Sequence, residues 1–193
     1  MITRKTMVAL SLMLLFVGTS YSQNKVKKIV SYNVLEGLKQ DSTNQQMFVE
    51  WAREMNPDVI AFQEMNQFTQ RSLELFAREY NHPYAILSRQ DGYPVALTSK
   101  YPIVNVQKVV DNMWHAYIYA RVDDIHFFVI HFSPHSLQKR LEEVDLILAH
   151  AKTLPQDEPV LIMGDFNAMD RSDADQYSEQ MAENMRKREE RQA

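Results

Sequence analysis

Hydrophobic and polar positions along this chain follow two different rhythms. In the first part, two short apolar runs are each followed by a stretch with helical spacing. These segments occupy residues 25–34, 43–55, 58–64 and 66–80. Apolar residues that recur every three or four positions indicate a helix with one buried face, whereas a short apolar run indicates a buried strand. The alternation predicts an α/β fold, and we expect Ser42 or Thr43 to cap the first helix.

From residue 84 the rhythm changes to short apolar runs separated by turn signals. The runs occupy residues 84–88, 94–99, 103–110, 117–122 and 125–132. Closely spaced strands of this kind predict a meander of neighbouring antiparallel strands. A longer helix is predicted over residues 136–154, and we expect its apolar stripe to face the core. The stripe consists of Leu137, Leu141, Val144, Leu148 and Ala151.

A last apolar run, residues 160–163, leads into Gly164-Asp165-Phe166-Asn167. We expect Gly164 to end the strand. Positions two apart on an extended chain point to the same side, so Asp165 and Asn167 would leave the strand together. Ligands of open α/β sheets collect at the carboxyl ends of strands, which makes this pair a candidate binding site. The alternative is an ordinary turn, because Gly, Asp and Asn are common turn residues.

Three earlier strands also end in polar side chains, namely Asn33, Glu64 and His131. A hard cation such as Mg²⁺ takes one or two carboxylates, with waters and substrate phosphate completing its shell. Glu64 and Asp165 supply carboxylates, and the amides of Asn33 and Asn167 bind metal, water or phosphate without adding charge. A histidine can transfer a proton or stabilise developing charge. The alternative is a set of unrelated polar residues at strand ends.

The length of 193 residues suggests one domain, which we place at residues 23–193. Residues 1–22 have the pattern of a signal peptide, with Arg4 and Lys5 before an apolar run at 7–17 and a small-x-small sequence ending at Ser22. This pattern predicts a secreted or periplasmic protein with no transmembrane segment after cleavage; an uncleaved anchor is the alternative. The chain has no cysteine and therefore no disulfide.

Charge gives a further restriction on partners. Loss of Arg4 and Lys5 from 21 basic residues would leave 19 against 25 acidic residues. This balance argues against purely electrostatic binding to nucleic acid. A phosphate-ester substrate bridged by a metal ion remains possible, because the ion contributes its own charge. The sequence does not indicate an oligomeric state.

Five short motifs, in this order and spacing, resemble those of the DNase-I-like endonuclease/exonuclease/phosphatase superfamily. They are Ser31-Tyr32-Asn33-Val34, Ala61-Phe62-Gln63-Glu64, Ser99-Lys100-Tyr101-Pro102-Ile103, Val129-Ile130-His131-Phe132 and Gly164-Asp165-Phe166-Asn167. The resemblance implies a two-sheet α/β sandwich flanked by helices. It also implies a metal-dependent phosphoester hydrolase, either a phosphodiesterase or nuclease or a phosphatase, that uses Mg²⁺ (with Mn²⁺ or Ca²⁺ as alternatives) to activate phosphate for attack by water.

The same resemblance implies roles for individual residues. Glu64, Asn33 and Asp165 would form the metal site, with Glu64 as the principal ligand. His131 would contact the scissile phosphate, and Asp165 and Asn167 would position the attacking water and a phosphate oxygen. Four other histidines are predicted to be structural or surface residues; they are His82, His115, His126 and His150. His135 lies nearer the site in the sequence, so a role in the site is the alternative to a structural or surface role there.

One departure from the family pattern concerns its second histidine, which follows Ser-Asp near the C-terminus. No histidine follows His150 in this sequence. We therefore expect a truncated chain with an incomplete catalytic set and an incomplete second sheet. The alternative function is an inactive or non-catalytic module that binds metal or phosphate.

Overall fold

A computed structural model describes residues 26, 28–168 and 178–190 of the chain. The predicted signal peptide, residues 1–22, lies outside the described residues. The elements in chain order are β1 (Ile29–Asn33), α1 (Leu35–Leu38), α2 (Ser42–Met55), β2 (Val59–Gln63), α3 (Gln70–Glu79), β3 (Tyr84–Leu87), β4 (Ala96–Ser99), β5 (Ile103–Val109), β6 (Ala116–Val122), β7 (Ile125–His131), α4 (Leu137–Ala151), β8 (Val160–Asp165) and α5 (Glu179–Glu190).

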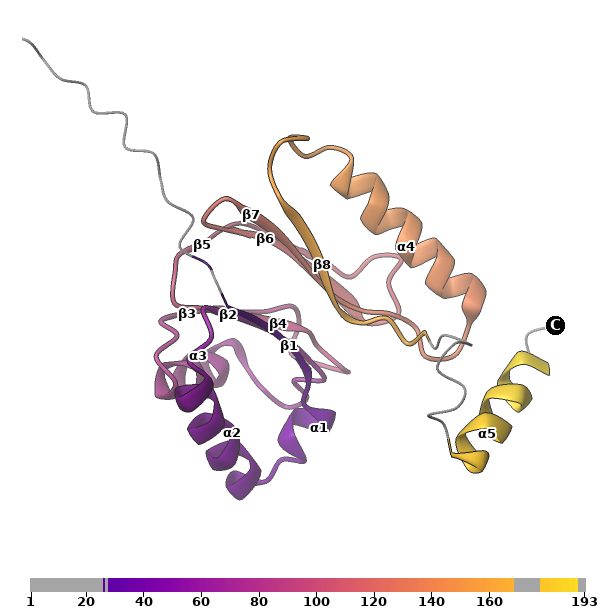
Figure 1. Cartoon of the computed structure of the whole chain (residues 1–193), viewed down its shortest axis with the longest axis horizontal. Coiled ribbons are helices and arrows are strands. Elements are labelled where there is room, and N and C mark those ends of the chain that lie inside the picture. The colour runs from indigo at the N-terminus through magenta and orange to yellow at the C-terminus, as the bar shows by residue number, and fades with distance from the viewer. Residues whose placement is uncertain (1–25, 27, 169–177, 191–193) are drawn as a thin grey trace, which may run out of the picture.

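The described strands form two four-stranded sheets that pack face to face (Figure 1). The strand order is β1-β2-β4-β3 in the first sheet and β5-β6-β7-β8 in the second. Helices α2 and α3 cover the outer face of the first sheet, and α4 covers the outer face of the second (Figure 1). The predicted two-sheet α/β architecture with flanking helices is confirmed.

The space between the sheets is an apolar core. Alternate residues of the central strands point into it, as the period of two in a strand requires. Fully buried examples are Ala61 of β2, Leu97 of β4, Ile118 of β6 and Val129 of β7. One further apolar layer lies between the first sheet and helices α2 and α3, and another lies between the second sheet and α4. Burial on both faces explains why the central strands read as almost continuous apolar runs.

The meander expected from residue 84 is divided between the sheets. Strand β4 pairs with β3 in the first sheet, whereas β5, β6 and β7 pair antiparallel in the second. The antiparallel neighbours were therefore predicted correctly, but the change of sheet between Ser99 and Ile103 was not. Turn residues show where a strand ends and carry no information on which sheet receives the next one.

Local sequence explains where the helices begin. Asp41, not Ser42 or Thr43, is the N-cap of α2, since its carboxylate accepts hydrogen bonds from the backbone N–H groups of Thr43 and Asn44. The predicted cap is therefore wrong by one or two positions. Helix α3 begins at Gln70 because Thr69 and Ser72 form a reciprocal capping box.

Helix α4 buries a different face from the one predicted. Leu137, Leu141 and Leu148 of the expected stripe are exposed, whereas Glu143 and Ile147 are buried. Val144 and Ala151 do pack against the second sheet, in agreement with the prediction. The helix is thus rotated so that a carboxylate enters the interior and several leucines remain outside.

A search of the described helices for a membrane-spanning segment finds none that combines the required length with the required hydrophobicity.

Candidate active site

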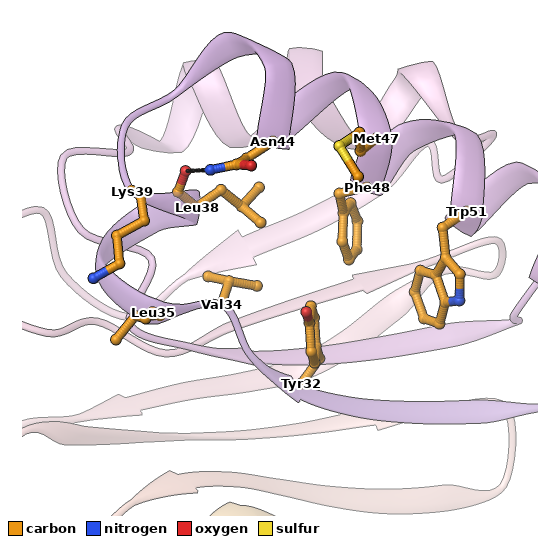
Figure 2. A pocket seen from close by; sticks show the side chains of 9 residues that line it. All are labelled: Tyr32, Val34, Leu35, Leu38, Lys39, Asn44, Met47, Phe48 and Trp51. Atoms are coloured by element: carbon orange, nitrogen blue, oxygen red, sulfur yellow. Dashed lines mark hydrogen bonds between the residues drawn. The ribbon is translucent and has the colours of Figure 1, made fainter.

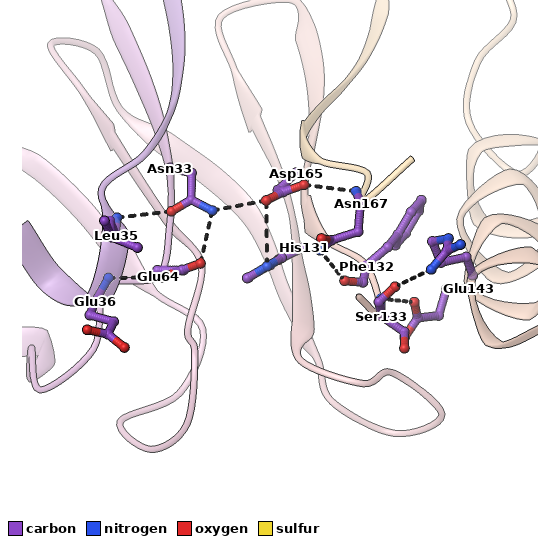
Figure 3. A network of polar contacts seen from close by, with 11 residues as sticks. Asn33, Leu35, Glu36, Glu64, His131, Phe132, Ser133, Glu143, Asp165 and Asn167 are labelled. Carbon is purple, nitrogen blue, oxygen red and sulfur yellow. Dashed lines mark hydrogen bonds and ion pairs between the residues drawn. The ribbon is translucent and has the colours of Figure 1, made fainter. Parts of the chain in front are cut away.

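The carboxyl ends of four strands from the two sheets meet at one edge of the sandwich (Figure 3). Parallel pairing sets Asn33 of β1 beside Gln63 of β2 in the first sheet. Parallel pairing in the second sheet sets His131 of β7 beside Asp165 of β8. Parallel strands end at the same edge, so the polar residues that close them are brought together.

Asn33 connects the two sheets at this edge. Its side-chain nitrogen donates to Glu64 Oε1 at 3.1 Å and to Asp165 Oδ2 at 3.0 Å. Its side-chain oxygen accepts the Leu35 backbone N–H at 3.0 Å. One amide therefore holds two carboxylates, from different sheets, close to a single point.

The backbone conformation at Glu64 and a hydrogen bond from a neighbouring backbone N–H orient its carboxylate. Glu64 has a left-handed φ of 62°, which turns the chain immediately after β2. Its second carboxylate oxygen accepts the backbone N–H of Glu36 at 2.9 Å. Non-glycine residues adopt this region rarely, and functional sites are a common place for it. Glu64 is thereby directed toward Asn33 and the cleft.

Asp165 and Asn167 leave β8 together, as predicted, although Gly164 does not end the strand. The strand continues to Asp165, and Asp165 Oδ1 accepts the Asn167 backbone N–H at 2.8 Å. The Asn167 side-chain amide donates to the carbonyl of Phe132 at 2.8 Å. The turn after β8 is thus tied both to its own carboxylate and to the segment that follows β7.

His131 is buried and faces Asp165, with 3.9 Å between Nε2 and Oδ2. This distance exceeds a direct hydrogen bond, so both groups keep capacity for a ligand. The ring nitrogen Nδ1 has no hydrogen-bond partner among the described residues. Burial lowers the pKa of His131, although Asp165 and Glu64 act in the opposite direction. The imidazole is therefore neutral near pH 7.

His115 is the residue that sequence reasoning missed. Its ring stacks on His131 with 4.1 Å between ring centroids and 21° between ring planes. Burial, followed by repulsion from the protonated form of His131 and from the Arg89 guanidinium, lowers the pKa of His115 to about 4. In the sequence, His115 follows Trp114 in a turn region between predicted strands, which by itself favours a structural or surface role. Nothing in the sequence indicates that this turn lies beside the end of β7.

These residues line an open cleft of about 540 Å³. Glu64, His115, His131, Asp165 and Asn167 contribute to one part of its wall. The rest is contributed by His135 and by residues that the sequence did not single out, namely Arg89, Gly92, Tyr93, Trp114 and Pro134. The predicted site residues other than Asn33 therefore share one cleft, and Asn33 contacts two of them directly.

The donor set fits a hydrated divalent cation. Two carboxylates, Glu64 and Asp165, lie around one amide nitrogen, and the cleft beside them is open to water. Mg²⁺ needs no more protein ligands than one or two carboxylates when waters and phosphate complete the octahedron. Among the described residues, no group of three His, Cys, Asp or Glu side chains is arranged to hold a metal by itself. The residues thus fit a metal site in which water and substrate supply the remaining ligands, and not a site formed by protein groups alone.

A second hollow, of about 500 Å³, lies between α2 and β1 (Figure 2). Its wall is mainly apolar and aromatic, including Tyr32, Phe48 and Trp51, and Lys39 is the charged side chain among its lining residues. It contains none of the carboxylates or histidines described above. Its chemistry does not suit a metal or a phosphate ester, so the cleft at the strand ends is the candidate active site.

Comparison with known proteins agrees with this fold. The family model of the "Endonuclease/Exonuclease/phosphatase family" matches residues 30–180. The Caenorhabditis elegans "Uncharacterized protein F14F9.5" is 26% identical over 179 residues, which are 78% of this chain and 56% of that protein. The chain belongs to the endonuclease/exonuclease/phosphatase family, whose fold is DNase-I-like. This family consists of phosphoester hydrolases that typically use a divalent metal.

Two solved structures share the fold at low sequence identity. TDP2 of D. rerio, complexed with a single-strand DNA product, has a TM-score of 0.59 and 18% identity, with 79% of this chain and 65% of that chain covered. An AP endonuclease from Archaeoglobus fulgidus has a TM-score of 0.56 and 18% identity, with 73% and 57% covered. The chain therefore spans between about half and two thirds of the length of these relatives.

Proposed function

We propose that this protein hydrolyses phosphate esters with the help of a divalent cation, Mg²⁺ in the first place. The observation that supports this most strongly is the junction of the two sheets. A single amide, Asn33, holds the carboxylates of Glu64 and Asp165 beside a neutral, buried His131. Two carboxylates next to a phosphate repel it, so such a site requires a cation to bind that substrate.

In this proposal each residue has a separate task. Glu64 and Asp165 would hold the cation, and the chemistry that it would supply there is polarisation of the phosphoryl group and stabilisation of the leaving oxygen. Asn33 keeps the two carboxylates together. Asp165 also orients the attacking water, and Asn167 is held beside it by the carbonyl of Phe132.

His131 is neutral near pH 7 and can donate a hydrogen bond to a phosphate oxygen. That donation stabilises the charge that develops as water attacks. Since TDP2 was solved with a single-strand DNA product, single-stranded DNA belongs among the substrates to test, together with simple phosphodiesters and phosphomonoesters.

The second candidate function is binding of metal or phosphate without turnover. It is favoured by the arrangement of the two carboxylates around the Asn33 amide, because these groups can bind a cation whether or not a general base completes the site. Absence of a general base typically lowers the rate about 10²–10⁴-fold. A protein that binds Mg²⁺ without such a base would show little hydrolysis.

The two functions are separated by measuring Mg²⁺ binding and hydrolysis on the same samples. We expect Mg²⁺ to raise the thermal midpoint and to support slow hydrolysis of bis(p-nitrophenyl) phosphate or single-stranded DNA. Glu64→Ala and Asp165→Ala should abolish both effects, whereas Glu142→Ala, an exposed carboxylate of α4, should change neither. Binding without hydrolysis would favour the second candidate. Equal Mg²⁺ responses in the wild type and in both site variants would refute both candidates.

A further inference from the structure

Glu143 is a fully buried carboxylate on the inner face of α4. Its Oε1 accepts the backbone N–H of Trp114. Its Oε2 accepts the backbone N–H of Ser133 at 2.8 Å, as Figure 3 shows. A buried carboxylate is costly unless hydrogen bonds compensate for its lost hydration. Here the compensation comes from two main-chain donors that are far apart in the sequence.

The two donors belong to the two segments that form the histidine pair. Trp114 directly precedes His115, and Ser133 follows His131 by two residues. One helix side chain thus joins the loop before β6 to the loop after β7. These are the positions that determine whether the two imidazole rings can stack.

The segment around Ser133 also contacts the end of β8 and the turn after it, which carry Asp165 and Asn167. Its neighbour Phe132 donates its N–H to the carbonyl of Asp165 at 2.9 Å and accepts the Asn167 amide at 2.8 Å. A shift of this segment would therefore move His131 and the acceptor that orients Asn167. Glu143 contacts the segment from α4, through the Ser133 backbone N–H.

Packing alone does not explain a carboxylate at this position. Ile147 and Val144 of the same helix supply the apolar contacts with the second sheet. A well-packed apolar residue is often as stabilising as a buried ion, or more so. None of the ion pairs between described residues includes Glu143. The particular property of a carboxylate here is that it accepts two hydrogen bonds from donors on separate loops.

We propose that Glu143 is a positioning residue, which fixes the His115–His131 stack and the Phe132 acceptor of Asn167 at the cleft. It acts through these residues and does not contact substrate. The proposal rests on the proposed function only in assuming that the cleft is where phosphate esters react.

The direct test observes the histidine rings by NMR, in protein labelled with ¹³C-histidine. Stacked rings shift one another's signals, so loss of the stack changes the signals of His115 and His131. His82 is an internal reference, because it is buried elsewhere and bonded to Thr98 and to the carbonyl of Pro57, at 2.9 Å each. Glu142→Gln is the matched control, an exposed neighbour on the same helix.

We expect Glu143→Ala and Glu143→Gln to shift the signals of His115 and His131 and to leave His82 in place. Glu143→Gln keeps the side chain's shape but retains one acceptor oxygen, so it tests the proposal even if the alanine variant does not fold. Glu142→Gln should shift none of the three. Unchanged signals of His115 and His131 in folded Glu143→Gln would overturn the proposal, and so would an equal shift of His82.

Hydrolysis supplies the second readout. Misplacement of groups by about 1 Å can reduce a rate about 100-fold, so we expect kcat to fall about 10–100-fold in Glu143→Gln with KM within about twofold of the wild type. An unchanged kcat would count against the positioning role. A wild-type protein that hydrolyses nothing would refute the proposed function instead, and the NMR result on the ring stack would still decide the role of Glu143.

Discussion

Substitution of Gly164 by alanine is the sharpest test of how the site is assembled. Gly164 lies opposite Ile130 in the parallel pair of β7 and β8, with a φ of +142°. A Cβ at this position would lie 2.0 Å from the Ile130 carbonyl oxygen and 2.9 Å from its carbonyl carbon. Both are backbone atoms of a central strand, so relief of the clash requires the two strands to separate.

The cost has two parts that can be estimated separately. The unfavourable φ of a non-glycine residue costs about 1–3 kcal/mol, and overpacking costs about 1–3 kcal/mol more. We therefore expect Gly164→Ala to lower the free energy of unfolding by about 2–6 kcal/mol. That is a large share of the roughly 5–15 kcal/mol typical of a domain.

Gly92→Ala is the matched control. Gly92 also has a positive φ, +65°, but a Cβ there would find its nearest neighbour, a guanidinium nitrogen of Arg89, at an ordinary 3.7 Å. It should cost only the conformational strain, about 1–2 kcal/mol. The difference between the two variants isolates the close approach of β8 to β7.

The assay is urea unfolding of both variants and the wild type, with linear extrapolation to water. The register that β7 and β8 share also places His131 beside Asp165. Gly164→Ala should therefore weaken the Mg²⁺-induced rise in thermal midpoint more than Gly92→Ala does. If the two variants unfold within about 0.5 kcal/mol of each other, the close approach of the strands does not limit what residue 164 can be.

Three further predictions concern stability. Burial holds the pKa of His115 at about 4 in the folded state, below the ordinary 6.5. Its contribution to the free energy of unfolding is therefore complete above pH 6.5 and is lost as the pH falls toward 4. Urea titrations at pH 7.5 and 5 should show this loss of stability, and a His115→Gln variant whose stability has the same pH dependence as the wild type would contradict the prediction. Ile147→Ala should lower the free energy of unfolding by about 2–5 kcal/mol and Leu141→Ala should hardly change it, because Ile147 is buried and Leu141 is exposed. Equal losses in urea unfolding would show that α4 buries the face that contains Leu141, as the sequence predicted. Asp41→Ala should lower the thermal midpoint and Ser42→Ala should not, since Asp41 caps α2; the reverse order would show that the cap is Ser42.

The amino-acid sequence by itself determined most of the helices and strands, and it indicated the main residues of the candidate site. Periodicity predicted β2, α2 and β7 to within a few residues. Polar residues directly after apolar runs identified Asn33, Glu64, His131 and Asp165. Both signals are local: they depend on a residue and its neighbours in the chain, and are therefore present before the chain folds.

Tertiary structure alone decided which segments meet. The rotation of α4, which buries Glu143 and exposes Leu141, depends on the shape of the sheet beneath it. The stacking of His115 on His131 depends on the antiparallel pairing of β6 with β7, which sets Ala116 opposite His131. The bridge from Asn33 to Asp165 joins residues 132 positions apart. Such contacts arise from the packing of segments that are distant in the sequence, so they cannot be predicted from a local pattern of apolar and polar residues.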